Sequence, residues 1–288
     1  MLVEPQEQLQ SEPLTEGEIR EVLQQAPKSN TSQGLHALFA KAICPSAGST
    51  RSTPALVCGK YYHLLHYIAN KTGNNNFAYF DFIFESVLEA RDSLDNPRSA
   101  LDRAKSEAER LFSIYRIDVS DPLLPEIVAS EEPISISGCD TVGFDAYVVN
   151  IPKPFVTSGY VLGGRPDRVE IRDGKLYGRD YKSLFAKNEG DKEAKLDTHV
   201  SGFNGMFLAW YQLIIGHQYG RTCHGMILDI AWKELRPKFT QSVLDFRDSV
   251  YFERLQTFFD TINFRFLTCP TMVNFGACQY LACTKCWE

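Results

Sequence analysis

One stretch constrains the fold of this chain more than any other, a predicted β-hairpin in residues 163–183 with the sequence GGRPDRVEIRDGKLYGRDYKS. Its dipeptide Asp173-Gly174 is typical of a type I′ turn, in which both central residues have positive φ. A two-residue turn at this place pairs Arg172 with Lys175. The same register, continued along both strands, places Asp167 directly opposite Asp180.

The alternation of side chains along a strand then predicts which residues share a face of the hairpin. One face carries Asp167, Val169, Ile171, Leu176, Gly178, Asp180 and Lys182, and the other carries Arg168, Glu170, Arg172, Lys175, Tyr177, Arg179 and Tyr181. The first face is apolar near the turn, so we expect it to point inward. Opposed Cβ atoms on one face lie ~4.5–5.5 Å apart.

Two facing carboxylates on an inward face repel one another unless a cation lies between them. Mg²⁺ and Mn²⁺ bind carboxylate oxygens and keep water molecules that can react. The pattern of Asp167, Asp180 and Lys182 therefore favours a catalytic metal site. The alternative is that Lys182 forms a plain salt bridge with Asp180 at the edge of an ordinary sheet.

The remaining sequence predicts a single α/β domain of mixed α+β order over residues 15–288, preceded by a mobile acidic tail at 1–14. Thr15 and Glu18 form a capping box that begins a helix. Helical patterns follow at 55–69, 76–115, 203–216 and 242–266, while 133–182 and 222–232 have the alternation and the turn residues of strands. Helices, a mostly local sheet and further helices indicate one packed core.

Composition excludes several other classes of protein. The chain has 288 residues, 44% of them hydrophobic, which excludes a disordered chain. No apolar stretch approaches the ~20 residues of a membrane span, and the N-terminus lacks a basic and apolar signal, so we expect an unsecreted, cytoplasmic protein encoded by a host cell or a virus. The net charge of −6 gives no bulk electrostatic argument for a nucleic-acid partner. It does not exclude a groove that is locally basic.

Cysteines cluster at the end of the sequence, where Cys278, Cys283 and Cys286 have the spacing of metal ligands. A reducing compartment favours metal ligation over disulfides. Two residues are candidates for the fourth ligand. Cys269 would complete a local site suited to zinc, and Cys44 is the other candidate. Three other cysteines, Cys58, Cys139 and Cys223, are expected to be ordinary buried thiols.

The hairpin resembles the PD-(D/E)xK nucleases, and in particular the RecB-like branch with iron–sulfur exonucleases of the CRISPR-associated and AddB types. Pro166-Asp167 followed by Asp180-Tyr181-Lys182 is similar to the family's signature. The resemblance implies a restriction-endonuclease-like core with a central mixed sheet flanked by helices. It also implies that Asp167 and Asp180 bind Mg²⁺ or Mn²⁺ and that Lys182 orients or activates the attacking water.

Further positions take part in the resemblance. Gly59 and His63 are similar to a glycine-x3-histidine helix in which the histidine joins the metal ligands; the alternative is a core histidine. The resemblance also makes Glu132 and Tyr211 accessory residues. At the family's glutamine-x3-tyrosine helix the match is poor, because Phe207 stands where glutamine is expected.

The cysteine layout is similar to that of the iron–sulfur members of this family, with one cysteine before the glycine–histidine helix and three at the C-terminus. This resemblance implies a [4Fe–4S] cluster on Cys44, Cys278, Cys283 and Cys286. The alternative is Zn²⁺ on the local set with Cys269. In either case the metal would have a structural role. On the set with Cys44 it would act as a clasp between distant parts of the chain.

The resulting hypothesis is a metal-dependent deoxyribonuclease, an exonuclease acting on single-stranded or end-frayed DNA, with a helicase or recombination protein as a further partner. A non-catalytic DNA-binding or helicase-docking module on the same fold is the second hypothesis, motivated by Phe207 and the acidic total charge. A third is an endonuclease on the same core.

We predict that the anaerobically purified protein is brown and absorbs near ~400 nm, as thiolate-ligated iron–sulfur clusters do. Cys44→Ser should abolish this absorbance and Cys269→Ser should preserve it. A colourless protein that contains zinc would contradict the cluster and favour the local four-cysteine site.

Overall fold

A computed structural model describes residues 12–26, 52–76, 78–118, 126–136, 139–151, 163–201, 203–233, 238–247 and 249–268. The chain divides into two compact units, one of Met1–Ala26 with Ser52–Asp118 and one of Pro27–Arg51 with Val119–Glu288. That residues 15–288 form a single domain stays a prediction. Among the described residues, no helix is long and apolar enough to cross a membrane.

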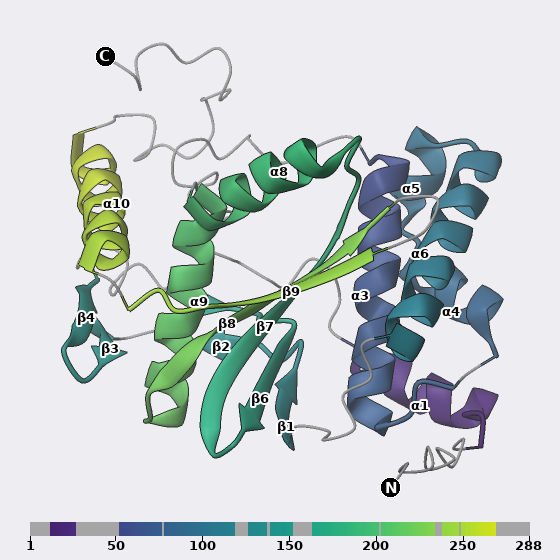
Figure 1. Ribbon diagram of the computed structural model, residues 1–288, viewed down its shortest axis with the longest axis horizontal. Coiled ribbons are helices and arrows are strands. Elements are labelled where there is room, and N and C mark those ends of the chain that lie inside the picture. The colour runs from purple at the N-terminus through teal and green to yellow at the C-terminus, as the bar shows by residue number, and fades with distance from the viewer. Residues whose placement is uncertain are drawn as a thin grey trace, which may run out of the picture. The chain divides into compact units, whose positions relative to one another are not determined.

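The first unit is helical. Its elements are α1 (Glu16–Gln25), α3 (Pro54–Thr72), α4 (Phe80–Val87), α5 (Ala90–Asp95) and α6 (Arg98–Asp118), and α3 packs along α6 (Figure 1). The predicted capping box of Thr15 and Glu18 is confirmed. Before it, the buried Leu14 donates its backbone N–H to the Asn76 carbonyl oxygen at 2.9 Å, so residues 12–14 of the expected tail belong to this unit.

The long helix α3 is built on the pattern that its sequence predicted. Thr53 caps its first turn, Pro54 takes the first helical position, and Gly73 ends the helix in the left-handed conformation. Val57, Tyr61, Leu65 and Ile68 recur at helical spacing and are fully buried. The predicted helical region 76–115, in contrast, is broken into α4, α5 and α6.

The second unit contains a mixed five-stranded sheet. Its strands β1 (Glu126–Ser130), β6 (Arg168–Arg172), β7 (Lys175–Leu184), β8 (Cys223–Trp232) and β9 (Lys238–Leu244) lie in the order β1-β6-β7-β8-β9. Only β7 and β8 are parallel among these neighbouring pairs. Two small sheets accompany it: β2 (Ile134–Ser135) pairs with β5 (Gly163–Gly164), and β3 (Thr141–Phe144) pairs with β4 (Tyr147–Asn150). The predicted α/β class is confirmed.

Helices α8 (Glu189–Ser201), α9 (Phe203–Tyr219) and α10 (Ser249–Thr268) complete this unit (Figure 1). Helix α9 buries Leu213 and Ile214 in one core with Val169 of β6 and Met226 of β8. Helix α10 packs on α9 and β4. The predicted helix at 242–266 begins only at Ser249, because the preceding residues pair with β8 as strand β9.

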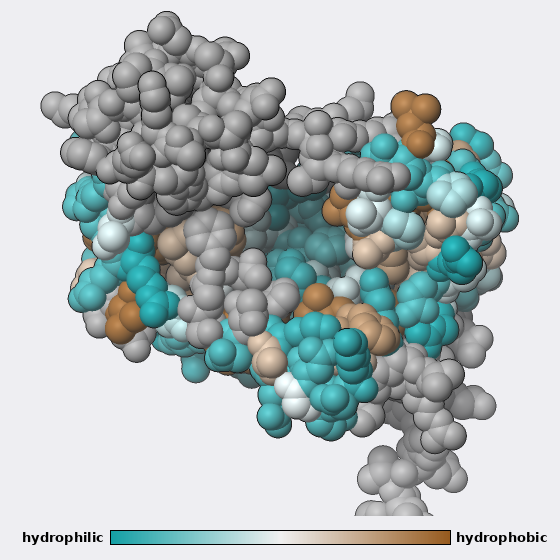
Figure 2. All heavy atoms as spheres, turned by 90° about the horizontal axis from the view of Figure 1, so that it is seen from above, coloured by the Kyte–Doolittle hydropathy of each residue, from teal (hydrophilic) through white to brown (hydrophobic). Residues whose placement is uncertain are grey.

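The described surface is mainly polar. On the face drawn in Figure 2, hydrophilic side chains cover most of the described surface and hydrophobic ones form small, separate patches. The most exposed large apolar side chain is that of Leu94, at 84%. Scattered apolar residues of this kind are normal on soluble domains.

The predicted hairpin register is confirmed. Asp173 and Gly174 have φ values of 47° and 72°, as a type I′ turn requires, and Arg172 pairs with Lys175. Pairing continues without a shift to Arg168 opposite Arg179. Val169 and Leu176, on the predicted inward face, are completely or almost completely buried.

The opposite face of the hairpin is buried at Glu170, Arg179 and Tyr181 and carries an ionic network. Glu170 is inaccessible to solvent and binds the guanidinium groups of Arg168, Arg172 and Arg179. Arg179 also binds Asp229 on β8, so its side chain links three neighbouring strands. Burial alone would raise the pKa of Glu170, but the three arginines outweigh it and hold the pKa below its ordinary value of 4.5. The stabilisation by ionised Glu170 is therefore present above pH 4.5 and is lost as the pH falls through the folded-state pKa.

We predict that Arg179→Ala lowers the free energy of unfolding by ~3–5 kcal/mol, because it leaves two buried carboxylates without their shared partner. Arg172→Ala is the matched control: it removes the same charge from a side chain that is 26% exposed and leaves Glu170 two arginines. Urea unfolding followed by circular dichroism measures both. Equal losses in the two variants would contradict the linking role of Arg179.

Candidate active site

Asp167 and Asp180 lie together on the inward face of the hairpin. Asp167 directly precedes β6 and Asp180 lies within β7. The Oδ2 atom of Asp167 accepts a hydrogen bond of 2.6 Å from the backbone N–H of Tyr181, which ties the two strands together beyond their last paired residues. The two aspartates are only 8% and 6% exposed, so their charges are largely shielded from water.

Lys182 compensates the charge of Asp180. Its Nζ atom lies 2.8 Å from Oδ1 and 2.7 Å from Oδ2 of that carboxylate. Burial lowers the pKa of Lys182, but the charges of Asp180 and Asp167 and the hydrogen bond to Asp180 outweigh burial and raise the pKa above its ordinary value of 10.5. One third of the Lys182 side chain is exposed.

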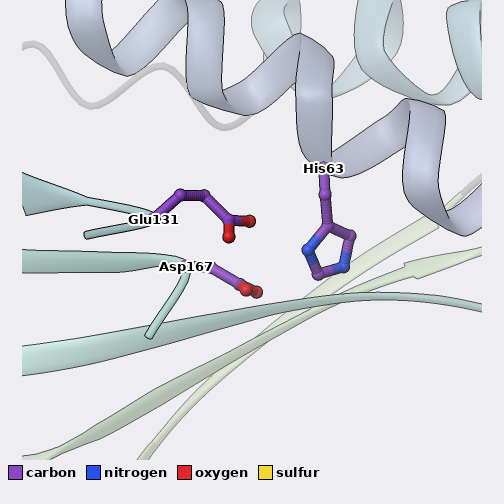
Figure 3. A group of neighbouring side chains, drawn as sticks. All are labelled: His63, Glu131 and Asp167. Carbon is purple, nitrogen blue, oxygen red and sulfur yellow. The ribbon is translucent and has the colours of Figure 1, made fainter. Parts of the chain in front are cut away.

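A third carboxylate, that of Glu131, lies beside Asp167. Glu131 follows β1, and its backbone N–H donates to the Asp167 carbonyl oxygen at 3.1 Å. Carboxylate oxygens of the two residues lie within 4.8 Å of each other, and Figure 3 shows both side chains projecting from neighbouring strand ends. The sequence prediction named Glu132 for this place. Glu131, which has a left-handed φ of 52°, is the buried acid, and Glu132 is exposed.

Tyr211 reaches the same site from α9. Burial raises the pKa of its hydroxyl, and the charges of Asp167 and Asp180 raise it further. The Arg165 backbone N–H hydrogen-bonds to this tyrosine. A Cβ atom at Gly164 would come within 2.4 Å of the Tyr211 ring, so the glycine allows the ring to pack directly on the chain before Asp167.

The polar residue after Tyr211 has a structural role. Gln212 is completely buried, and its amide group donates to the Cys223 carbonyl oxygen and to Asp245, while its oxygen accepts from the Phe246 backbone N–H. Phe207, one turn before Tyr211, packs against the apolar core of the second unit. No glutamine therefore stands on this helix at the position that the resemblance expects.

The two histidines of α3 differ in their surroundings. His66 is 3% exposed, and its ring packs between those of Tyr62 and Phe112, as in a core histidine. His63 is half-buried on the same helix, in the first unit. Its participation in a metal site with residues of the second unit stays a prediction.

The predicted cluster ligands Cys44, Cys278, Cys283 and Cys286, and the alternative ligand Cys269, lie outside the described residues. Of the remaining cysteines, Cys58 and Cys223 are buried, as expected, and Cys139 is half-buried. Burial raises the pKa of the Cys223 thiol to about 12, so this thiol is unreactive at neutral pH.

The donor set suits a hard divalent cation. Glu131 and Asp167 offer neighbouring carboxylate oxygens, the ligands that Mg²⁺ and Mn²⁺ prefer, in surroundings that are almost closed to solvent. Asp180, bound to Lys182, lies outside the group whose donor atoms are all within 4.8 Å of one another. Two oxygens bound to one Mg²⁺ at ~2.0–2.1 Å lie at most ~4.2 Å apart. The oxygens of Glu131 and Asp167, within 4.8 Å of each other, need only a small rotation to meet this requirement.

Comparison with known proteins gives distant structural likenesses alone. No family model and no curated protein matches this chain. A solved structure from Eubacterium rectale, named "Putative exonuclease", is 12% identical with a TM-score of 0.41, covering 84% of this chain and 76% of its own. The structure of the protein SSO0001 is 11% identical with a TM-score of 0.31, covering 89% of this chain and 96% of its own. At these TM-scores neither likeness indicates a shared activity.

Proposed function

We propose that this chain is a divalent-metal-dependent nuclease that hydrolyses phosphodiester bonds of DNA. One observation carries the proposal: Asp167 and Asp180 converge with Lys182 on the inward side of one hairpin, with Glu131 beside them. A sheet with a merely structural role gains little from three nearly buried carboxylates that outnumber the two neighbouring cations, Lys182 and Arg165, because each buried charge costs desolvation free energy.

In this mechanism Asp167 and Asp180, with Glu131, would hold Mg²⁺ or Mn²⁺. The cation would supply positive charge at the scissile phosphate and a water of lowered pKa. Lys182, held by Asp180, orients the attacking water and balances the negative charge that develops on the phosphate. Tyr211, packed on Gly164, keeps the segment before Asp167 in place.

The remaining parts of the proposal come from the resemblance seen in the sequence. His63 would add a nitrogen ligand to the cation, and Cys44, Cys278, Cys283 and Cys286 would hold a [4Fe–4S] cluster as a structural clasp. The substrate would be single-stranded or end-frayed DNA, degraded from its ends, with a helicase or recombination protein as partner.

A second candidate function is a non-catalytic DNA-binding or partner-docking module. The observation that favours it is Phe207, an apolar core residue at the position where the nuclease family carries glutamine. Such a module would bind DNA or a partner protein and would show no turnover with any divalent ion.

We predict that Asp180→Asn lowers DNA cleavage in Mn²⁺ by ~10³-fold or more, since several kcal/mol of charge stabilisation is lost and each 1.36 kcal/mol is a factor of ten. DNA binding, measured in Ca²⁺ by fluorescence anisotropy, should persist. Asp173→Asn is the matched control, because it removes the same charge from the exposed tip of the same hairpin, where asparagine tolerates positive φ. Full activity of Asp180→Asn would end this mechanism.

The DNA substrates of this assay separate the alternatives. End-labelled single-stranded and linear duplex DNA should be shortened, while a closed circle should stay intact. Discrete fragments from the circle would identify an endonuclease. Binding without cleavage of any substrate would favour the non-catalytic module.

A further inference from the structure

A half-buried arginine lies beside the acids and has no role in the proposed mechanism. Arg165 lies between β5 and β6, two residues before Asp167. Its Nε atom is 2.8 Å from Oε2 of Glu131, and the two side chains are only 17% and 10% exposed. Its Nη1 atom is buried and has no hydrogen-bond partner among the described residues.

A buried guanidinium nitrogen without an acceptor is unusual. Nearly all buried polar side-chain atoms have a partner, and leaving a charged donor unpaired is costly. Arg168 also has a buried nitrogen without a hydrogen bond, its Nε atom, but that atom lies 2.7 Å from a carboxylate oxygen of Glu170. Arg172 and Arg179 bind the same glutamate on the opposite face. An acceptor that arrives with a ligand would satisfy Arg165.

The position of Arg165 indicates what that ligand is. The backbone N–H of Arg165 hydrogen-bonds to Tyr211. Glu131, the partner of the Arg165 side chain, also lies beside the Asp167 carboxylate. Both the main chain and the side chain of Arg165 are therefore held at the acid cluster. Glu131 engages one edge of the guanidinium through Nε and leaves Nη1 available. Planar guanidinium groups match the oxygens of phosphates with charge-assisted hydrogen bonds.

We propose that Arg165 is a further catalytic residue, which donates from Nη1 to a non-bridging oxygen of the substrate phosphate. Glu131 is a positioning residue in this arrangement, because it fixes the direction of the guanidinium. The inference rests on the proposed nuclease function and specifies it: the substrate group at this site is an anionic phosphodiester, bound opposite the metal-binding carboxylates by a fixed cation.

The test compares Arg165→Gln and Arg165→Lys with Arg221→Gln. Arg221 is the matched control, an exposed arginine whose side chain donates to the Gly174 carbonyl oxygen at the hairpin turn. Removing one preorganised donor to a transition-state oxyanion costs ~10²–10³-fold in rate, so Arg165→Gln should lose about that factor in kcat/KM. Arg165→Lys, which keeps the charge and the pairing with Glu131, should recover part of the loss, and Arg221→Gln should stay within ~3-fold of the wild type.

A single-stranded oligonucleotide with one methylphosphonate linkage distinguishes phosphate contact from a merely structural role. Replacing the contacted oxygen by a methyl group should slow the wild type at that linkage, in one of the two isomers, and should cause little further loss in Arg165→Gln. This non-additivity is the mark of two groups in direct interaction. Fully multiplicative losses, or an Arg165→Gln variant within ~3-fold of the wild type, would overturn the proposal.

A wild type that cuts no DNA would refute the nuclease function. The affinity of the variants for DNA would then test the phosphate contact of Arg165 separately. In Ca²⁺, Arg165→Gln should bind a short single-stranded oligonucleotide at least ~10-fold more weakly than Arg221→Gln, as expected for a lost charge-assisted contact. Equal affinities of the two variants would overturn the phosphate contact.

Discussion

The register of one hairpin is the constraint on which the rest of the structure depends. Asp173 and Gly174 both adopt positive φ, and this turn sets Arg172 opposite Lys175. A slip of one residue would move every side chain of a strand to the other face of the sheet. The aspartates at 167 and 180 would then no longer share a face, and the apolar residues between them would leave the core.

Charge compensation follows from this register on both faces of the sheet. On one face, Arg179 is shared by Glu170 and Asp229, so three adjacent strands are joined by buried ion pairs. On the other, Lys182 balances Asp180 and Arg165 pairs with Glu131, so two cations lie among the three acids Glu131, Asp167 and Asp180. Ion pairs that join three strands suit a structural role on the first face, and the excess of one acid over the two cations on the second suits a site for a divalent cation.

The parts of this site that could be predicted from the sequence depend on local rules. A two-residue turn and strict alternation were sufficient to bring the hairpin aspartates together. The family resemblance pointed to Glu132, whereas the structure places its neighbour Glu131 beside Asp167. The left-handed φ of Glu131 just after β1 is a feature that no local sequence pattern reports. Residues 242–244 were assigned to a helix because their pairing with β8 is a long-range contact that no local pattern reports. The burial of Glu170, Arg179 and Tyr181 on the second hairpin face likewise depends on tertiary packing. No local sequence pattern predicts burial for a face rich in arginine and tyrosine.

The most direct test of the central claim is a nuclease assay that compares the wild type with Lys182→Ala on end-labelled single-stranded DNA, with Mg²⁺ or Mn²⁺ and with a chelator. The account predicts progressive, metal-dependent shortening of the DNA by the wild type and loss of that activity in the variant, with both proteins folded and able to bind DNA. Equal cleavage by the two proteins, or cleavage that persists in the chelator, would contradict an active centre built on the hairpin acids and Lys182.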